Sequence, residues 1–146
     1  MTATRYDQPN RTARAVNAVF RSLAEVGVTI AGTQVLRVRG RKTGEVRRVV
    51  VNLLTVEGRD YVVSPRGNTQ WARNTRAAGA VTLGSRWSSD PANVTEVADA
   101  AKVQLLRAYL QRWYWEVKGH VGGLTPDSTD AEILAVAPSI PVFELS

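Results

Sequence analysis

The amino-acid sequence of 146 residues predicts an α+β domain built around an antiparallel sheet or a small barrel. Three observations predict this fold: about six stretches have the period-two pattern of strands, helical patterns lie between and beside them, and several connections are too short for a crossover helix. A hydrophobic fraction of 44% and four Trp allow a sizeable core. No repeat or linker divides the chain, so we expect residues 1–146 to be a single domain.

The N-terminal part is expected to contain a loose arm followed by a helix. Residues 1–10 are polar and end in Pro and Asn, whereas apolar residues recur at spacings of three and four from Thr12 to Val26. The polar face of this helix carries Arg11 and Arg14, which would either cover an anionic ligand or contact a membrane surface. The pattern leaves both interpretations open.

The middle of the chain changes to alternating, β-branched residues, which are typical of strands. We expect strands at Val35–Arg39, Arg47–Val56 and Tyr61–Ser64, joined by short turns as a meander. The run Val49–Val51 suggests that the second strand is buried on both faces.

The second half alternates helices with strands. We expect a helix over Thr69–Ala78, a hairpin of Ala80–Trp87 and Asn93–Val97 that turns at Ser88–Pro91, a long helix from Asp99 to about Val117, a short helix over Thr129–Leu134 and a last strand, Pro141–Leu145.

The long helix carries an apolar stripe that predicts its buried face: Val103, Leu106, Leu110, Trp113 and Val117. Trp113, Tyr114 and Trp115 are consecutive, and three consecutive helical residues spread over about 200° of the surface. At least one of Tyr114 and Trp115 should therefore face a loop, a pocket or another subunit.

The composition excludes several kinds of chemistry. The chain has no Cys and one His, His120, so disulfides, a Cys nucleophile and a typical zinc site are not expected, and no metal is predicted. Neither GxGxxG nor GxxxxGK[ST] occurs. If the protein is an enzyme, a bound organic cofactor should supply the chemistry. No secretory signal or membrane-spanning run is visible, so a cytoplasmic location is expected, with peripheral membrane contact possible.

Positive charge is concentrated in one segment. Residues 37–76 hold ten Arg or Lys and three acids, a net charge of +7, while the whole chain carries +6. This segment contains the turn Gly40-Arg41-Lys42-Thr43-Gly44 and then Arg47. Turn amides and the Thr43 hydroxyl can receive phosphate or carboxylate oxygens, and the cations add charge-assisted bonds.

We therefore expect an anionic partner, with a solvated basic face as the alternative. A nucleic-acid-binding module would also account for the positive charge, but such a module ordinarily has aromatic residues interleaved with its basic strands. The two basic strands contain none, so nucleic acid is not the predicted partner.

Three motifs in register identify a family resemblance. Val38-Arg39-Gly40-Arg41-Lys42-Thr43-Gly44, then Gly58-Arg59-Asp60-Tyr61-Val62-Val63-Ser64-Pro65-Arg66-Gly67-Asn68, then Trp71-Ala72-Arg73-Asn74 resemble the deazaflavin (F420)-dependent nitroreductase and quinone reductase family over residues 33–84. The resemblance implies a split β-barrel like that of FMN-binding oxidases.

The resemblance also implies a cofactor site. It assigns the phosphate and oligoglutamate tail of coenzyme F420 to Arg41, Lys42, Thr43 and Arg47, the deazaflavin ring to Val62, Val63 and Ser64, and the enclosing loop and helix to Arg66, Gly67, Trp71 and Asn74. The chain departs from the family where Val49–Val51 replaces a frequent Pro, and where Pro65-Arg66-Gly67-Asn68 replaces a frequent Gly-Gly pair.

The implied activity is hydride transfer from reduced F420 to a nitroaromatic, a quinone or a conjugated enone or lactone. Tyr109, Trp113 and Tyr114 would line the acceptor pocket, and Tyr109, Tyr114 or solvent would donate a proton. Backbone amides near Ser64 would steady developing charge. An FMN-dependent oxidoreductase of the same fold and a non-catalytic F420 carrier are the alternatives. Both a monomer and a homodimer are compatible with the resemblance.

Overall fold

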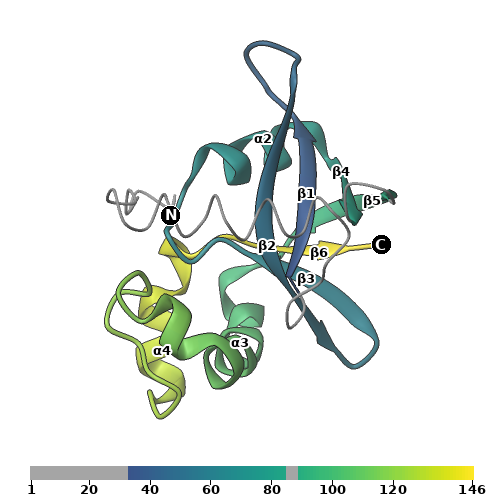
Figure 1. Ribbon diagram of the computed structural model, residues 1–146. Coiled ribbons are helices and arrows are strands. Elements are labelled where there is room, and N and C mark those ends of the chain that lie inside the picture. The colour runs from purple at the N-terminus through teal and green to yellow at the C-terminus, as the bar shows by residue number, and fades with distance from the viewer. Residues whose placement is uncertain (1–32, 85–88) are drawn as a thin grey trace.

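The computed structural model describes residues 33–84 and 89–146, which fold as a six-stranded barrel with helices packed against it (Figure 1). The strands are β1 (Thr33–Arg39), β2 (Val46–Val56), β3 (Arg59–Val63), β4 (Ala80–Gly84), β5 (Ser89–Glu96) and β6 (Val142–Leu145). The barrel is closed in the order β1-β2-β3-β6-β5-β4, and each neighbouring pair is antiparallel. The predicted α+β split barrel is confirmed. The predicted arm and N-terminal helix lie outside the described residues.

The helices are α2 (Gln70–Ala78), α3 (Lys102–Val117) and α4 (Asp130–Val136). The α2 helix begins at Thr69, whose hydroxyl accepts a hydrogen bond from the Ala72 amide at 3.3 Å, and it ends at Gly79 with φ 71°. Helices often end at a residue in this left-handed backbone conformation, which glycine adopts without a steric penalty. The α4 helix begins with a capping box of Thr129 and Glu132.

Two apolar clusters form the core. One fills the barrel around the fully buried Phe143 and includes Leu36, Val62 and Ala72 of α2. The other lies between the barrel and α3 and α4, which Figure 1 shows together at the end of the barrel away from α2. The long strand β2 contributes to both clusters, through Val51 to the first and through Leu54 to the second.

The second predicted hairpin needs a correction. β5 begins at Ser89, so Ser88–Pro91 is not the turn: Thr82 pairs with Pro91 and Leu83 pairs with Asp90. A proline lacks the amide that a central strand needs. Pro91 is tolerated because β6 pairs with β5 only from Val94 onwards.

Three finer predictions also change. Val51 is buried, but Val49 and Val50 are only half-buried, so β2 is not fully buried on both faces. The long helix begins at Lys102, because Asp99–Ala101 forms a 3-10 turn. Val103, predicted for the buried stripe, is half-buried, whereas the other four stripe residues are buried.

No helix within the described ranges 33–84 and 89–146 combines the length and the apolar character that crossing a membrane requires.

Candidate cofactor and acceptor site

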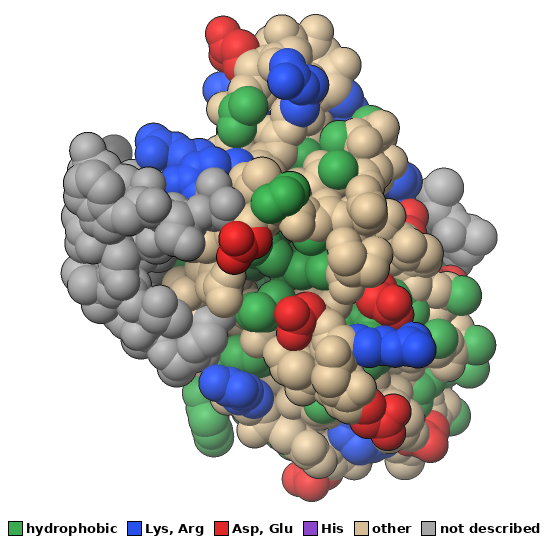
Figure 2. Space-filling model, turned by 90° about the vertical axis from the view of Figure 1, so that its right-hand side faces the viewer, with side chains coloured by type: hydrophobic (Ala, Val, Ile, Leu, Met, Phe, Trp, Pro, Cys, Tyr) green, Lys and Arg blue, Asp and Glu red, His purple; other side chains and the backbone are tan. Residues whose placement is uncertain are grey.

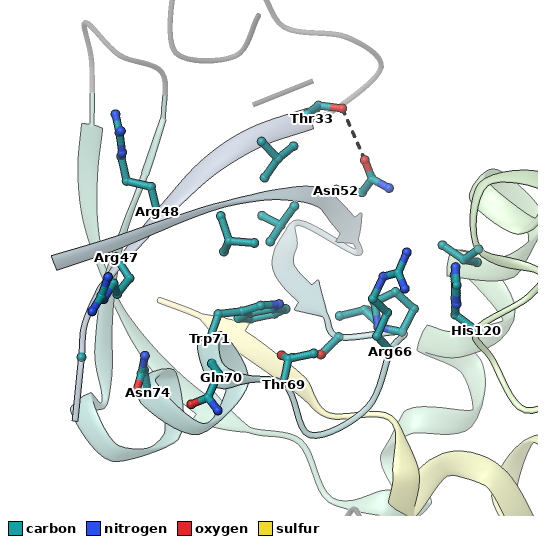
Figure 3. A pocket seen from close by; sticks show the side chains of 18 of the residues that line it. Thr33, Arg47, Arg48, Asn52, Arg66, Thr69, Gln70, Trp71, Asn74 and His120 are labelled. Carbon is teal, nitrogen blue, oxygen red and sulfur yellow. Dashed lines mark hydrogen bonds between the residues drawn. The ribbon is translucent and has the colours of Figure 1, made fainter. Parts of the chain in front are cut away.

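A cavity of about 680 Å³ is lined by residues of the β1–β2 hairpin, the β3–α2 loop, α2 and α3 (Figure 3). Its volume falls within the range of small-molecule sites, roughly 300–1,000 Å³. The lining residues are Thr33, Gly40, Arg41, Lys42, Thr43, Arg47, Arg48, Val49, Val50, Val51, Asn52, Val63, Ser64, Pro65, Arg66, Thr69, Gln70, Trp71, Asn74, Tyr109, Glu116, Val117 and His120.

The basic turn between β1 and β2 projects from the barrel and carries charged side chains at its tip (Figure 2). The Gly40 amide donates to the Glu45 carbonyl at 2.7 Å, and the Gly44 amide donates to the Gly40 carbonyl at 2.9 Å. The Glu45 amide donates to the Thr43 hydroxyl at 3.2 Å. These three amides already have partners within the turn and are not open to an anion. The Lys42 and Arg47 side chains of the turn are exposed to solvent.

Arg41 is fastened to α2. Its backbone amide and its Nη1 both donate to Asn74 Oδ1, at 3.1 and 2.8 Å, and Nη1 also donates to Gln70 Oε1 at 3.0 Å. Asn74 is 6% exposed, so its side chain is a fixed anchor. These three hydrogen bonds hold the basic turn against the helix and so define one wall of the cavity.

Exposed cations surround the end of the cavity formed by the β1–β2 hairpin, which we call the cationic end. Lys42, Arg47 and Arg48 are all exposed, and Figure 3 places Arg47 and Arg48 on the side of the cavity away from Arg66 and His120. Arg47 lies 3.5 Å from Glu45, with both side chains more than half exposed. Exposed pairs of this kind contribute little to stability. Arg47 therefore loses little if it turns towards an anionic ligand.

The loop after β3 is closed on itself. The Ser64 hydroxyl donates to the Gly67 carbonyl at 2.6 Å and lies 3.1 Å from the Thr69 hydroxyl. The Ser64 amide donates to the Pro141 carbonyl at 2.9 Å, the Gly67 amide to Ser64 O at 3.1 Å and the Thr69 amide to Gly67 O at 2.8 Å. The amides of Ser64, Gly67 and Thr69 are thus already used and would not steady developing charge. Arg66 brings a positive charge to the cavity wall instead.

Apolar side chains form the middle of the cavity. Val49, Val50 and Val51 come from β2, Val63 comes from β3, and Trp71 comes from the first turn of α2. The Trp71 ring is half-buried and lies 6.3 Å from the Phe143 ring of the barrel core. Contact with the packed core holds this wall in place, so the cavity offers a flat ligand a preformed apolar surface.

A polar cluster lies at the α3 side of the cavity. Tyr109 is 2% exposed, and burial raises the pKa of its phenol, with a further increase from the Glu116 carboxylate and an opposing effect from a hydrogen bond with Asn52. Asn52 also donates from Nδ2 to Glu116 Oε2 at 3.2 Å and accepts from the Thr33 hydroxyl at 3.4 Å. The phenol is therefore neutral at physiological pH and retains its proton.

Most of the residues predicted for the site line one cavity: Arg41, Lys42, Thr43, Arg47, Val63, Ser64, Arg66, Trp71, Asn74 and Tyr109. Four others do not line it. Val62 points into the barrel core with no exposed surface, and Gly67 is buried within its loop. Trp113 is buried with its ring 5.1 Å from the Tyr109 ring, and Tyr114 packs partly against the core.

The exposed aromatic expected near the end of α3 is Trp115, which is 80% exposed. Its ring contacts Tyr114 at 5.2 Å and lies 5.0 Å from Lys118 Nζ. A kink at Trp113, with φ −123° and ψ 17°, changes the direction in which the following side chains project.

Sequence reasoning missed several lining residues: Thr33, Arg48, Asn52, Thr69, Gln70, Glu116, Val117 and His120. Asn52 offered one signal, since it is a polar residue between the apolar Val51 and Leu53 of β2. Glu116 and His120 offered none, because only the packing of α3 against the barrel brings them to the cavity.

The fold and the cavity together define a split-barrel domain with a small-molecule cavity on its side. A model of the F420H(2)-dependent quinone reductase family matches residues 11–118, which is well over half of the chain. The chain belongs to the F420H(2)-dependent quinone reductase family.

Solved structures share the fold at low sequence identity. A chain described as a domain-swapped dimer is 18% identical with a TM-score of 0.56, covering 92% of this chain and 99% of that chain. An F420-H2 dependent reductase (FDR-A) is 18% identical with a TM-score of 0.54, over 82% of this chain and 100% of that one. A NimC/NimA family protein from Clostridium acetobutylicum is 12% identical with a TM-score of 0.52, over 86% and 81%. No curated protein matches the chain significantly.

Proposed function

We propose that this protein is an F420H2-dependent reductase that delivers a hydride to a small electron-poor acceptor. The observation that carries the proposal is a single cavity that joins a cationic end, an apolar middle and a buried neutral phenol. The family description makes quinones the first acceptor class to test. Nitroaromatics and conjugated enones or lactones are electron-poor in the same way.

The residues present fit the cofactor. Coenzyme F420 joins a flat deazaflavin ring to an anionic tail of phosphate and glutamates, and the cavity offers an apolar slot beside exposed Lys42, Arg47 and Arg48. Arginine can bind phosphate and carboxylate oxygens through two parallel hydrogen bonds. Arg41 has its Nη1 committed to α2, so we assign it to orienting the turn as well as to adding positive charge.

Each wall of the cavity would have a distinct task. Val63 and Trp71 would hold the ring by apolar contact, and the closed Ser64–Thr69 loop would keep that surface rigid. When bound, the reduced deazaflavin supplies the hydride from its C5 carbon. The chain itself would hold donor and acceptor close together and exclude water, a role that can supply much of a rate enhancement.

Two side chains could assist the reaction directly. Arg66 would place positive charge where electron density grows on the acceptor. Tyr109 retains its proton because burial raises its pKa, and its hydroxyl could donate that proton to a reduced acceptor. Tyr114 does not line the cavity, which favours Tyr109 or solvent as the proton source.

The direct test is anaerobic turnover. Purified protein would be mixed with F420H2 and menadione, and the oxidation of the cofactor followed by its absorbance, with a boiled-protein control and a parallel reaction supplied with reduced FMN. Catalysed oxidation of F420H2 alone supports the proposal. Catalysis with FMN alone would assign the protein to an FMN-dependent reaction of the same fold. Tight F420 binding without turnover of any acceptor class would indicate a carrier.

A further inference from the structure

Glu116 is the one acidic residue among the described residues that line the cavity. The same lining contains five cations, Arg41, Lys42, Arg47, Arg48 and Arg66, and the single histidine, His120. A carboxylate in such surroundings opposes the binding of the anionic cofactor that the other charges favour. Its presence therefore calls for an explanation from its position in the cavity.

Glu116 lies on the α3 side and is tied across the cavity to the barrel. Its Oε2 accepts from Asn52 Nδ2 at 3.2 Å, and the two residues are 64 positions apart in the chain. Asn52 in turn accepts from the Thr33 hydroxyl at 3.4 Å and shares a hydrogen bond with Tyr109. Figure 3 shows Asn52 towards the side of His120 and Arg66, away from the basic turn. The Asn52–Glu116 hydrogen bond directs the exposed Glu116 carboxylate towards Asn52.

The two ends of the cavity differ in net charge. The hairpin end carries Arg41, Lys42, Arg47 and Arg48, a formal charge of +4. On the α3 side, the formal charges of Arg66 and Glu116 cancel. Without Glu116 the α3 side would also be positive, and a small acidic molecule would be attracted throughout the cavity. Burial is the main cause that raises the pKa of Tyr109, and the nearby Glu116 carboxylate raises it further.

We infer that Glu116 is a specificity-determining residue that disfavours negatively charged acceptors, so that the natural acceptor is an uncharged molecule. Asn52 acts as the positioning residue that holds the carboxylate at the α3 side of the cavity. This inference rests on the proposed function, since that function makes the α3 side the acceptor end. The inference goes beyond the proposed function by naming the side chain that selects against charged acceptors.

Glu116→Gln tests the inference because glutamine removes the charge and can still accept the hydrogen bond from Asn52. Asp127→Asn is the matched control: it removes one exposed carboxylate from the loop before α4, outside the cavity lining. Arg66→Gln is the opposing variant, since it removes the positive charge that Glu116 balances.

The probes are 1,4-naphthoquinone and 1,4-naphthoquinone-2-sulfonate, which differ by one negative charge. Their dissociation constants would be measured by calorimetry on protein saturated with oxidised F420, which fills the cationic end and makes turnover unnecessary. Thermal melts of each variant would verify that the fold is intact.

Glu116→Gln is expected to improve the affinity for the sulfonate relative to the neutral quinone about fivefold, the effect of one charge several ångströms away in a partly hydrated cavity. Arg66→Gln should shift the same ratio in the opposite direction, and Asp127→Asn should leave it within about twofold.

Two results would overturn the inference: an unchanged affinity ratio in a folded Glu116→Gln variant, or an equal change for both quinones, which would indicate a purely structural role. Failure of the wild-type protein to bind F420 in the first step would instead refute the proposed function, and the inference with it.

Discussion

Asn74 offers a sharp test of how the cationic end of the cavity is held. Its Oδ1 accepts hydrogen bonds from the Arg41 amide at 3.1 Å and from Arg41 Nη1 at 2.8 Å, while Gln70 accepts from the same Nη1 at 3.0 Å. Replacing Asn74 with Ala removes both of its bonds. The basic turn would then be joined to α2 by Gln70 alone.

The expected cost follows from these two bonds. The hydrogen bond from the Arg41 amide contributes about 1 kcal/mol to stability, and the one from the charged guanidinium contributes about 1.5 kcal/mol or more. Water at the rim of the cavity can replace part of these interactions in the variant. The net loss in the free energy of unfolding is therefore about 1.5 kcal/mol. For a chain of this length that corresponds to a fall in Tm of about 3–6 °C. The loosened turn should also weaken F420 binding about threefold to tenfold, because the lost pre-organisation must be recovered on binding.

Two further variants separate stability from affinity. Asn74→Asp keeps an acceptor for Arg41 and so should preserve Tm, but its negative charge should weaken binding of the anionic tail. Gln70→Ala removes one exposed bond and should lower Tm by less than about 2 °C. The assays are thermal unfolding and fluorescence titration with F420. A Tm within 1 °C and an affinity within twofold of wild type for Asn74→Ala would refute the reasoning.

Three other predictions concern charge, proton donation and pH. The double variant Lys42→Gln, Arg47→Gln should raise the Kd for F420 by at least about tenfold and weaken the dependence of that Kd on salt. The kcat at saturating cofactor should change by less than about threefold. A larger effect on kcat than on Kd would contradict the assignment of these two residues to cofactor binding. Tyr109→Phe should lower turnover without altering the affinity for F420. Single-turnover rates and a titration with F420 measure the two quantities. Unchanged rates would mean that solvent, and not Tyr109, donates the proton to the reduced acceptor. Arg76 donates two hydrogen bonds to the Glu96 carboxylate, at 2.7 and 2.8 Å, and these lower the pKa of Glu96. The ion pair therefore stabilises the folded protein at pH values above the ordinary pKa of 4.5. That stabilisation is lost as the pH falls through the lowered pKa of Glu96 in the folded protein. Glu96→Gln should therefore lower Tm at neutral pH and reduce its fall on acidification, whereas parallel Tm–pH curves would show that the pair is not the cause.

The fold could be predicted from the sequence to a large extent because it is encoded in local patterns. Period-two alternation located β1, β2 and β3 within two residues, and Thr69 and Gly79 predicted the limits of α2. The second hairpin was misplaced because Pro91 usually indicates a turn, and only the pairing of strands around the barrel reveals a position where a missing amide is tolerated.

The cavity was predictable only in part, and the missed residues have a common cause. The hairpin, the β3–α2 loop and α2 are neighbours along the chain, so motifs in register indicated their shared site. Asn52 and Glu116 meet across 64 residues, and no local pattern records that contact. The partners of backbone amides are equally hard to predict from sequence. The turn at Gly40–Gly44 resembles an anion-binding nest, yet the Gly40 and Gly44 amides bond within the turn and the Arg41 amide bonds to Asn74.

We propose that this cavity binds coenzyme F420 through its cationic end. The most direct measurement is a fluorescence titration of the purified protein with F420, run in parallel with FMN and repeated at raised salt. The account predicts micromolar or tighter binding of F420, weaker binding of FMN, and a loss of F420 affinity as salt screens the exposed Lys42, Arg47 and Arg48. Preferential binding of FMN, or F420 binding that is indifferent to salt, would contradict it.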